Sequence, residues 1–269
     1  MSQRPLLQVE NLHTHFQTGG GLFSEKTWIR AVDGVSFDIH DGEVLSLVGE
    51  SGCGKSTVGR TLTHLEQATH GRALFQGRDI LTMDAGTFRR LRRDIQMIFQ
   101  DPFASLNPRL TIRQTLAEPL FIHALAQTHA EARARIAETL ETVGLDPTVM
   151  DRFPHAFSGG QRQRIGIARV MILNPRLVIA DEAVSALDVS IQAQVLNLIK
   201  KLQRQSGMSL LFISHDLGVV RHISDRVAVM FQGQIVEIGD KRQIFENPQH
   251  AYTRKLLSSI PRITGKATG

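Results

Sequence analysis

The sequence predicts an α/β fold in which a helical segment interrupts a sheet of buried strands. Three observations support this prediction. The first ninety residues alternate short apolar runs with Gly and Asp, which is typical of strands and turns. Residues 103–165 instead show mostly helical periodicity. Two continuous apolar runs, "RLVIADE" at 176–182 and "SLLFISHD" at 209–216, indicate strands of a parallel sheet that is covered on both faces.

Composition sets limits on what the chain can be. Its 269 residues are 42 % hydrophobic, enough for a sizeable core without disulfides. The single cysteine, Cys53, excludes an internal disulfide and any cysteine-only zinc or iron–sulfur site in this chain. A net charge of +5 suits a phosphate-bearing ligand, of which nucleic acid is one kind. We expect no signal peptide in the opening residues and no apolar run long enough to span a membrane.

The strands are expected in a definite order. Residues 6–16, 31–40 and 43–49 alternate or run apolar between turn residues. Residues 73–80 and 227–239 each read as a hairpin with a Gln-Gly turn. Residues 19–28 between the first strands are a glycine-led loop, and the arginines of 88–94 are expected on a solvated helix face.

The starts and ends of the helices are predicted from N-cap residues and from glycines that follow the last helical turn. Thr128 with Glu131 reads as a capping box, and Gly144 ends that helix. Ser190 is expected to cap a helix that Gly207 ends. The helix after residue 57 follows a strand and a glycine-rich loop, and the tail from 246 has too weak a pattern for a prediction.

The glycine-rich loop, "GESGCGKST" at 49–57, matches the phosphate-binding pattern G-x-x-x-x-G-K-S/T. Glycines allow backbone N–H groups to wrap a phosphate, and the following helix adds its partial positive charge. Lys55 is expected to reach the β and γ phosphates, and Ser56 to hold Mg²⁺. The nucleotide-binding residues predicted here are Gly49, Ser51, Gly52, Cys53, Gly54, Lys55, Ser56 and Thr57.

Two further patterns supply the other groups that hydrolysis of a nucleotide needs. Asp181 ends a buried strand, where a carboxylate can hold Mg²⁺, and Glu182 follows it, where it can polarise the attacking water. "FSGGQRQR" at 157–164 places a serine and two glycines at the start of another helix. This second phosphate-binding helix end makes sense if it faces the nucleotide of another subunit.

The chain resembles an ATP-binding-cassette (ABC) ATPase over nearly its whole length. The resemblance implies a P-loop NTPase (RecA-like) core with an antiparallel β subdomain and an inserted α-helical subdomain. The resemblance also implies that residues 1–269 form one domain with three parts. These are the β subdomain with the core (1–102 and 166–245), the helical subdomain (103–165) and a C-terminal extension (246–269). It implies catalytic roles for Glu182 and the switch histidine His215, and magnesium contacts for Ser56, Gln100 and Asp181. Phe16 would stack on adenine, and the signature residues Ser158, Gly159, Gly160 and Gln161 and the loop residue Asp188 would serve a partner's nucleotide.

Stretches at 99–112, 181–198 and 246–261 resemble the oligopeptide, dipeptide and nickel importers. This implies an ATP- and Mg²⁺-dependent subunit that powers peptide import, at the cytoplasmic face of the inner membrane. Its implied partners are a second, distinct cassette subunit, two membrane permeases and, indirectly, a solute-binding protein, with no nucleic acid and no iron–sulfur cluster. Nickel-complex, glutathione or opine import stays open. A soluble, non-transport ABC ATPase is a weaker alternative, and a simple P-loop kinase would not explain "FSGGQ".

Four residues carry secondary expectations. Phe157 and Ala183 stand where leucine and proline are commoner in the family, and Ala183 should leave the backbone after Glu182 less restrained. Trp28 is a weaker candidate than Phe16 for adenine. Cys53, beside Lys55 and a helix N-terminus, is expected to have its thiolate favoured and to react with a maleimide, with small size as the alternative reason for its presence.

Overall fold

The computed structural model describes residues 4–18, 27–101, 106–185 and 187–258. Its centre is a six-stranded sheet in the order β10-β9-β3-β8-β7-β6. Five of these strands run parallel and β10 is antiparallel to β9. The strands span β3 (Val44–Val48), β6 (Ile95–Ile98), β7 (Leu177–Asp181), β8 (Ser209–Ser214), β9 (Arg226–Phe231) and β10 (Gln234–Asp240). β3, β7 and β8 are buried throughout, as the continuous apolar runs predict.

A second, antiparallel sheet of four strands has the order β2-β1-β4-β5. Its strands are β1 (Leu7–Thr18), β2 (Thr27–Ile39), β4 (His70–Phe75) and β5 (Arg78–Asp79). Both predicted Gln-Gly hairpin turns are confirmed, with positive φ at Gln76 and Gly77 and at Gln232 and Gly233. Two successive positive φ values give the tight turn whose twist matches that of paired strands.

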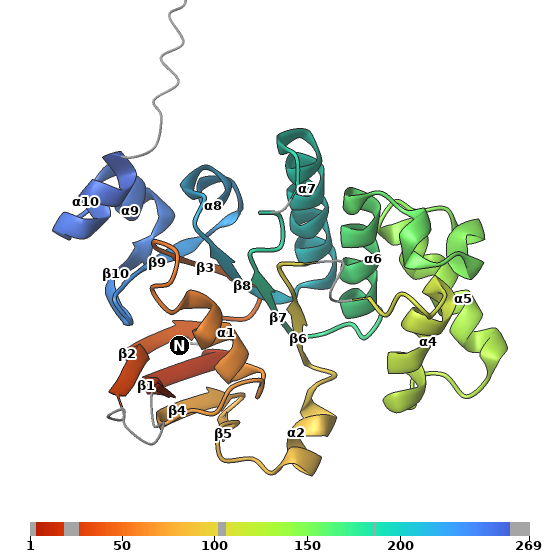
Figure 1. Ribbon diagram of the computed structural model, residues 1–269, viewed down its shortest axis with the longest axis horizontal. Coiled ribbons are helices and arrows are strands. Elements are labelled where there is room, and N and C mark those ends of the chain that lie inside the picture. Colours follow the sequence, from red (N-terminus) through yellow and green to blue (C-terminus); the bar gives the residue numbers. More distant parts are fainter. Residues whose placement is uncertain (1–3, 19–26, 102–105, 186, 259–269) are drawn as a thin grey trace, which may run out of the picture.

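Helices cover the parallel sheet and build the segment between β6 and β7 (Figure 1). Figure 1 shows α1 beside β1 and β2, whereas α4, α5 and α6 gather on the far side of β6 and β7. Among the described residues, none of the helices is long and apolar enough to cross a membrane. The helices are α1 (Lys55–Leu62), α2 (Ala85–Leu91), α4 (Ile112–Ile122), α5 (His129–Thr142), α6 (Gly159–Met171), α7 (Val189–Ser206), α8 (Leu217–Ile223), α9 (Lys241–Glu246) and α10 (Ala251–Ser258), with short 3-10 turns at Pro147–Asp151 and Pro154–Ala156.

Two hydrophobic cores lie on opposite faces of the parallel sheet. One joins alternate residues of β3, β7 and β8, such as Leu45 and Ile213, to α1 and the antiparallel sheet. The other joins the intervening residues, such as Phe212 and Val178, to α6, α7, α8 and the inserted helices. Because successive strand residues point to opposite faces, one short strand serves both cores. The sheet is therefore the fixed frame that carries the loops at its carboxyl edge.

The structure differs from the sequence prediction at several helix ends. Asp188 is the N-cap of α7, and Ser190 lies inside the helix, so the predicted Ser190 cap is wrong. At α5, Thr128 accepts from the Glu131 N–H as predicted, but the Glu131 carboxylate accepts from the Gln127 N–H instead of closing the box. Gly144 and Gly207 take positive φ after their helices, as predicted.

Two further differences concern the helical segment and the tail. α6 crosses the predicted boundary between 165 and 166, so one helix belongs to both the insert and the core packing. The tail forms α9 and α10, for which the sequence gives no clear periodicity. Some residues named in the sequence analysis lie outside the described residues. These are 102–105 of the 99–112 stretch, Ala186 of the loop before Asp188, most of the 19–28 loop and the end of the 246–261 stretch.

Candidate nucleotide and hydrolysis site

The loop between β3 and α1 is wound tightly between the two sheets. Gly54, the N-cap of α1, has φ +106°, and a Cβ there would collide with the carbonyl oxygen of Ala31 on β2. Gly49 likewise faces the carbonyl of Met230, with no room for a Cβ. Ser51 and Gly52 are exposed at the loop's tip, and Thr57 is half-buried in α1. The loop therefore needs glycine at these two positions for packing as well as for phosphate approach.

Lys55 is buried inside its own loop. It is 4 % exposed, and its ammonium donates to the carbonyls of Gly49 (2.9 Å) and Glu50 (2.8 Å). A buried ammonium must keep hydrogen-bond partners, and here the loop itself provides them. The same ammonium, at the centre of the glycine-rich turn, is placed to meet phosphate oxygens that enter the loop.

Ser56 and Asp181 form a direct contact between α1 and the end of β7. The Ser56 hydroxyl donates to Asp181 Oδ1 at 2.7 Å. Burial raises the pKa of Asp181, the nearby Glu182 adds to that rise, and the Ser56 bond, Arg60 and Lys55 oppose it. A hydroxyl and a carboxylate side by side are the oxygen ligands that Mg²⁺ takes in phosphate sites, so the residues present fit this ion.

Glu182 is joined to the two neighbouring strand ends. Gln100, after β6, donates from Nε2 to Glu182 Oε2 at 2.9 Å. His215, after β8, lies with Nδ1 3.2 Å from Glu182 Oε1. The carboxyl ends of adjacent parallel strands thus bring together three residues that are far apart in the sequence. Glu182, Gln100 and His215, which the sequence analysis predicts for the site, thus form one hydrogen-bonded group.

Backbone strain accompanies this carboxylate. Glu182 has φ +46°, a left-handed conformation that a non-glycine residue adopts only when its surroundings hold it. Its N–H donates to Ile213, and its carbonyl accepts from the Ser185 hydroxyl at 3.0 Å. Gln163 of α6, 1 % exposed, donates to the next carbonyl, that of Ala183, at 2.6 Å. These bonds hold the backbone around Ala183, and the lower restraint expected from alanine in place of proline stays a prediction.

Gln163 is a residue that sequence reasoning missed. It stands in the quoted stretch 157–164, one helical turn beyond Gly159, but the sequence does not reveal that its amide faces β7. Since it ties the signature helix to the residue after Glu182, it helps to hold the backbone beside the Glu182 carboxylate from the α6 side. Phe157 is 5 % exposed and packs in the same core, so an aromatic residue is accommodated at that position.

The signature residues lie at the exposed start of α6. Ser158 and Gln161 form a capping box. The Gln161 N–H donates to the Ser158 hydroxyl at 3.3 Å, and the Ser158 N–H donates to the side-chain oxygen of Gln161, Oε1, at 3.1 Å. A Cβ at Gly160 would press on Ile191 of α7, and Gly159 lies beside Leu187. Figure 1 places α6 away from α1, with β6 and β7 between them. Asp188 is exposed at the start of α7 and forms no side-chain cap bond.

Phe16 and Trp28 face opposite sides of the antiparallel sheet. Thr14, two residues before Phe16, bonds Thr61 of α1 at 3.0 Å, so this side of β1 faces the loop and α1. Phe16 shares that side because side chains alternate along a strand. Trp28 pairs with Gln17 and therefore shares the other side, where it is 60 % exposed. Of the two aromatic residues, only Phe16 points toward the nucleotide loop.

Cys53 differs from the sequence expectation. Its side chain is 8 % exposed, and burial raises the pKa of the thiol, while the adjacent Lys55 opposes that rise without reversing it. The prediction of a favoured thiolate is wrong because loss of hydration outweighs one neighbouring charge. A small buried side chain with Sγ 3.7 Å from the Lys55 ammonium fits the packing explanation.

Tyr252 joins the C-terminal segment to the nucleotide loop. It is 7 % exposed in α10, stacks on Phe231 at 4.2 Å, and accepts a hydrogen bond from the Glu50 N–H at 3.2 Å. The sequence alone indicates only that Tyr252 packs. The hydrogen bond to the loop was missed, since 202 residues separate the partners and no spacing rule links them.

The comparisons with known proteins agree with this geometry. Residues 32–185 match the ABC transporter family model, and residues 236–269 match the C-terminal region of oligopeptide/dipeptide transporters. The chain belongs to the ABC transporter family, so the predicted class, an ABC-type ATPase, is confirmed. The predicted peptide-uptake branch is confirmed by the C-terminal match.

Similar sequences are glutathione import ATP-binding proteins. The chain is 56 % identical to the one of Pectobacterium atrosepticum over 258 residues and 57 % identical to that of Escherichia coli K12. Each alignment covers 96 % of this chain and 41 % of the relative, so the chain spans about two fifths of their length. Among solved structures, the dimeric post-hydrolysis state of the cassette MJ0796 with ADP and Pi has a TM-score of 0.78 at 28 % identity, covering 88 % of this chain and 99 % of that one.

We predict that Glu182→Gln binds ATP but loses hydrolysis by about 10²–10⁴-fold, the range for a lost general base. Gln keeps the shape and the contacts of the side chain but cannot take a proton from water. Steady-state phosphate release, with ATP affinity measured separately, tests this. Glu138→Gln, on an exposed part of α5, is the control, and near-normal hydrolysis by Glu182→Gln would contradict the role.

Asp181→Asn is expected to raise the melting temperature of the nucleotide-free protein at pH 7. Burial raises the folded-state pKa of Asp181. Its ionised form therefore destabilises the fold once the pH exceeds the unfolded value, and the gain from Asn should vanish in acid, where both forms are neutral. Thermal denaturation in EDTA across pH measures it. Asp146→Asn, at a carboxylate whose pKa the Thr148 N–H lowers, should give no such gain.

Phe16→Ala should weaken ATP binding by about five- to 150-fold, the equivalent of the roughly 1–3 kcal/mol of a base–aromatic stack. Trp28→Ala, on the opposite side of the sheet, should leave the affinity unchanged. Fluorescent-nucleotide titration of both variants measures the difference, and the reverse ranking would assign adenine to Trp28.

Proposed function

We propose that this chain is the ATP-hydrolysing subunit of an importer for glutathione or a similar small peptide. The observation that carries the proposal is the 56–57 % identity, across 96 % of the chain, to proteins described as glutathione import ATP-binding proteins. The oligopeptide/dipeptide C-terminal region supports a peptide-type solute. Dipeptides, longer peptides, nickel complexes and opine-like solutes are the alternatives that the test must separate.

The proposed hydrolysis uses the residues at the carboxyl edge of the sheet. The N–H groups of 49–57 and the Lys55 ammonium bind the phosphates, and Lys55 exchanges its loop carbonyls for phosphate oxygens. Ser56 and Asp181 would hold Mg²⁺, which neutralises phosphate charge when bound. Glu182 takes the proton of the attacking water, while Gln100 and His215 orient the carboxylate from either side.

A complete site is proposed to need two cassettes. The start of α6 is exposed and lies away from α1, so Ser158 and Gly160 are placed to meet phosphates bound by a partner. Asp188 lies at the start of α7, which packs against α6, and would touch the same partner. A solved dimer of the similar cassette MJ0796 supports pairing. We favour a distinct second cassette subunit, as the peptide branch implies.

A membrane subunit is proposed to dock on a groove of about 390 Å³ between α2, β6, α4 and α6. Its lining includes Leu65, Phe99 and Ile122, which are 51 %, 40 % and 52 % exposed. Phe99 directly precedes Gln100, so a helix seated in this groove would lie next to the hydrolysis site. Exposed apolar side chains gathered in one groove mark an interaction surface. The chain would then work at the cytoplasmic face of the membrane, with a solute-binding protein on the other side.

Reconstitution with two permeases and the binding protein in proteoliposomes tests the import function. Glutathione with its binding protein should raise ATP hydrolysis severalfold, and Ile122→Asp should keep basal hydrolysis but lose that stimulation. Stimulation by nickel complexes or dipeptides alone would reassign the cargo. Hydrolysis that no solute stimulates, but that ribosomes or DNA stimulate, would overturn import in favour of a non-transport ATPase.

Two inactive subunits should complement each other if the sites are composite. Lys55→Ala removes phosphate binding, and Ser158→Arg blocks the signature face. In a mixed pair of these variants one site keeps both intact halves, and we expect partial recovery of ATP hydrolysis. The mixture is run with and without the second cassette subunit. No recovery at any ratio would contradict either the trans arrangement or the pairing of two copies of this chain.

A further inference from the structure

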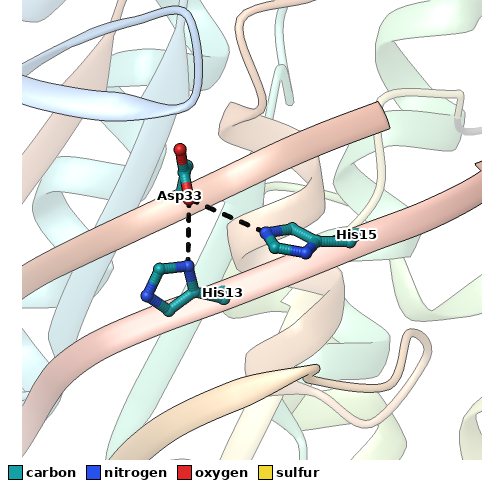
Figure 2. Close-up of side chains that lie close together, drawn as sticks. All are labelled: His13, His15 and Asp33. Atoms are coloured by element: carbon teal, nitrogen blue, oxygen red, sulfur yellow. Dashed lines mark hydrogen bonds and ion pairs between the residues drawn. The ribbon is translucent and has the colours of Figure 1, made fainter. Parts of the chain in front are cut away.

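A cluster of two histidines and one carboxylate lies on the face of the antiparallel sheet that is turned away from α1. His13 and His15 are two residues apart on β1 and share one face, and Asp33 is the direct partner of His13 on β2 (Figure 2). His13 Nδ1 lies 3.1 Å and His15 Nε2 3.7 Å from the same oxygen, Asp33 Oδ1. The three ligand atoms are all within 4.8 Å of one another.

The hydrogen-bond pattern of the cluster is incomplete. His13 Nε2 lies 3.1 Å from the side-chain oxygen of Asn11, which can only accept, so Nε2 carries a proton. In the neutral ring the lone pair of Nδ1 then faces a carboxylate oxygen at 3.1 Å, and either a proton or a metal ion between them would remove the repulsion. His15 Nε2 is buried and has no hydrogen-bond partner. A second proton on His13 would satisfy His13 and Asp33 but would leave His15 Nε2 unpartnered.

We propose that His13, His15 and Asp33 bind one divalent transition-metal ion of the Zn²⁺ class. Zn²⁺ takes imidazole and carboxylate ligands at about 2.0–2.2 Å, which places tetrahedral ligand atoms about 3.3–3.6 Å apart. The distances in the cluster, 3.1 and 3.7 Å to the shared oxygen, are close to that spacing. Water completes the coordination, because each of the three side chains remains about one fifth exposed.

The groups around the cluster support the ligand roles. Asn11 holds the far nitrogen of His13, which fixes the tautomer that leaves Nδ1 free for a metal. Arg30 approaches the other oxygen of Asp33, Oδ2, at 3.7 Å, so Oδ1 stays available. The backbone adds rigidity: the Asp33 N–H donates to Gly233, and the Gly233 N–H donates to Cys53 of the nucleotide loop. An ion here would join β1 to β2 on the face of the sheet opposite α1, at a place separate from the residues predicted to contact magnesium.

The test uses Co²⁺ as the spectroscopic probe and tag-free, nucleotide-free full-length protein. We expect one equivalent of Co²⁺ to give the intense visible bands of four-coordinate cobalt, which added Zn²⁺ abolishes. His15→Ala and Asp33→Asn should remove these bands, and Asn11→Ala should weaken affinity by about 10–100-fold, as expected for a partner of a ligand. His40→Ala is the matched control, because His40 Nε2 pairs with Asp38 Oδ2 at 2.9 Å in an ion pair that contains one histidine.

A measurement on the unchanged protein guards against variants that fail to fold. Zn²⁺ should protect His13 and His15, but not His40, from modification by diethylpyrocarbonate, read by mass spectrometry of peptides. Protection together with the four-coordinate spectrum supports the site. Weak octahedral cobalt bands, more than one equal site, or no protection of His13 and His15 would overturn it. ATP affinity measured in the same samples keeps this outcome independent of the importer proposal.

Discussion

The hydrogen bond between Ser56 and Asp181 joins the two elements on which the rest of the site depends. It connects the first turn of α1 to the end of β7, and thus the nucleotide loop to the strand that carries Glu182. Asp181 is the last residue of β7, and Ser56 lies in the helix that follows β3, two strands away in the sheet. Their separation therefore depends on the spacing of these strands and on the packing of α1. The hydrophobic cores on the two faces hold that spacing, so apolar packing fixes the relative positions of Ser56 and Asp181.

The Glu182 carboxylate shows how a site is assembled from several directions. β6 brings Gln100, β8 brings His215, and α6 holds the following carbonyl through Gln163. Each contact comes from an element that also packs elsewhere, so a shift of α6 or of the β6 end changes the position of the carboxylate. These contacts hold the left-handed backbone conformation of Glu182, which a glutamate does not favour by itself.

Much of the fold follows from local patterns in the sequence. The buried runs, the Gln-Gly turns and the glycine stops at 144 and 207 each act over a few residues, and the structure has them where predicted. What failed depends on neighbours distant in the sequence. The Cys53 thiol is governed by burial that no motif reveals. The Ser190 error is of another kind: α7 begins after Asp188, which forms no side-chain cap bond, so cap preference did not decide where this helix begins. Gln163 and Tyr252 gained their roles only through tertiary contacts.

The bond from the Glu50 N–H to the Tyr252 hydroxyl also bears on how the protein is made. The two partners are 202 residues apart, and β9 and β10, which carry Phe231 beneath the tyrosine, also come late in the chain. A ribosome releases the nucleotide loop long before it releases these strands, and the contacts of longest range form last. During synthesis the loop therefore stays without its full set of supports until Tyr252 has emerged, so a nascent chain should gain full nucleotide affinity only after that point.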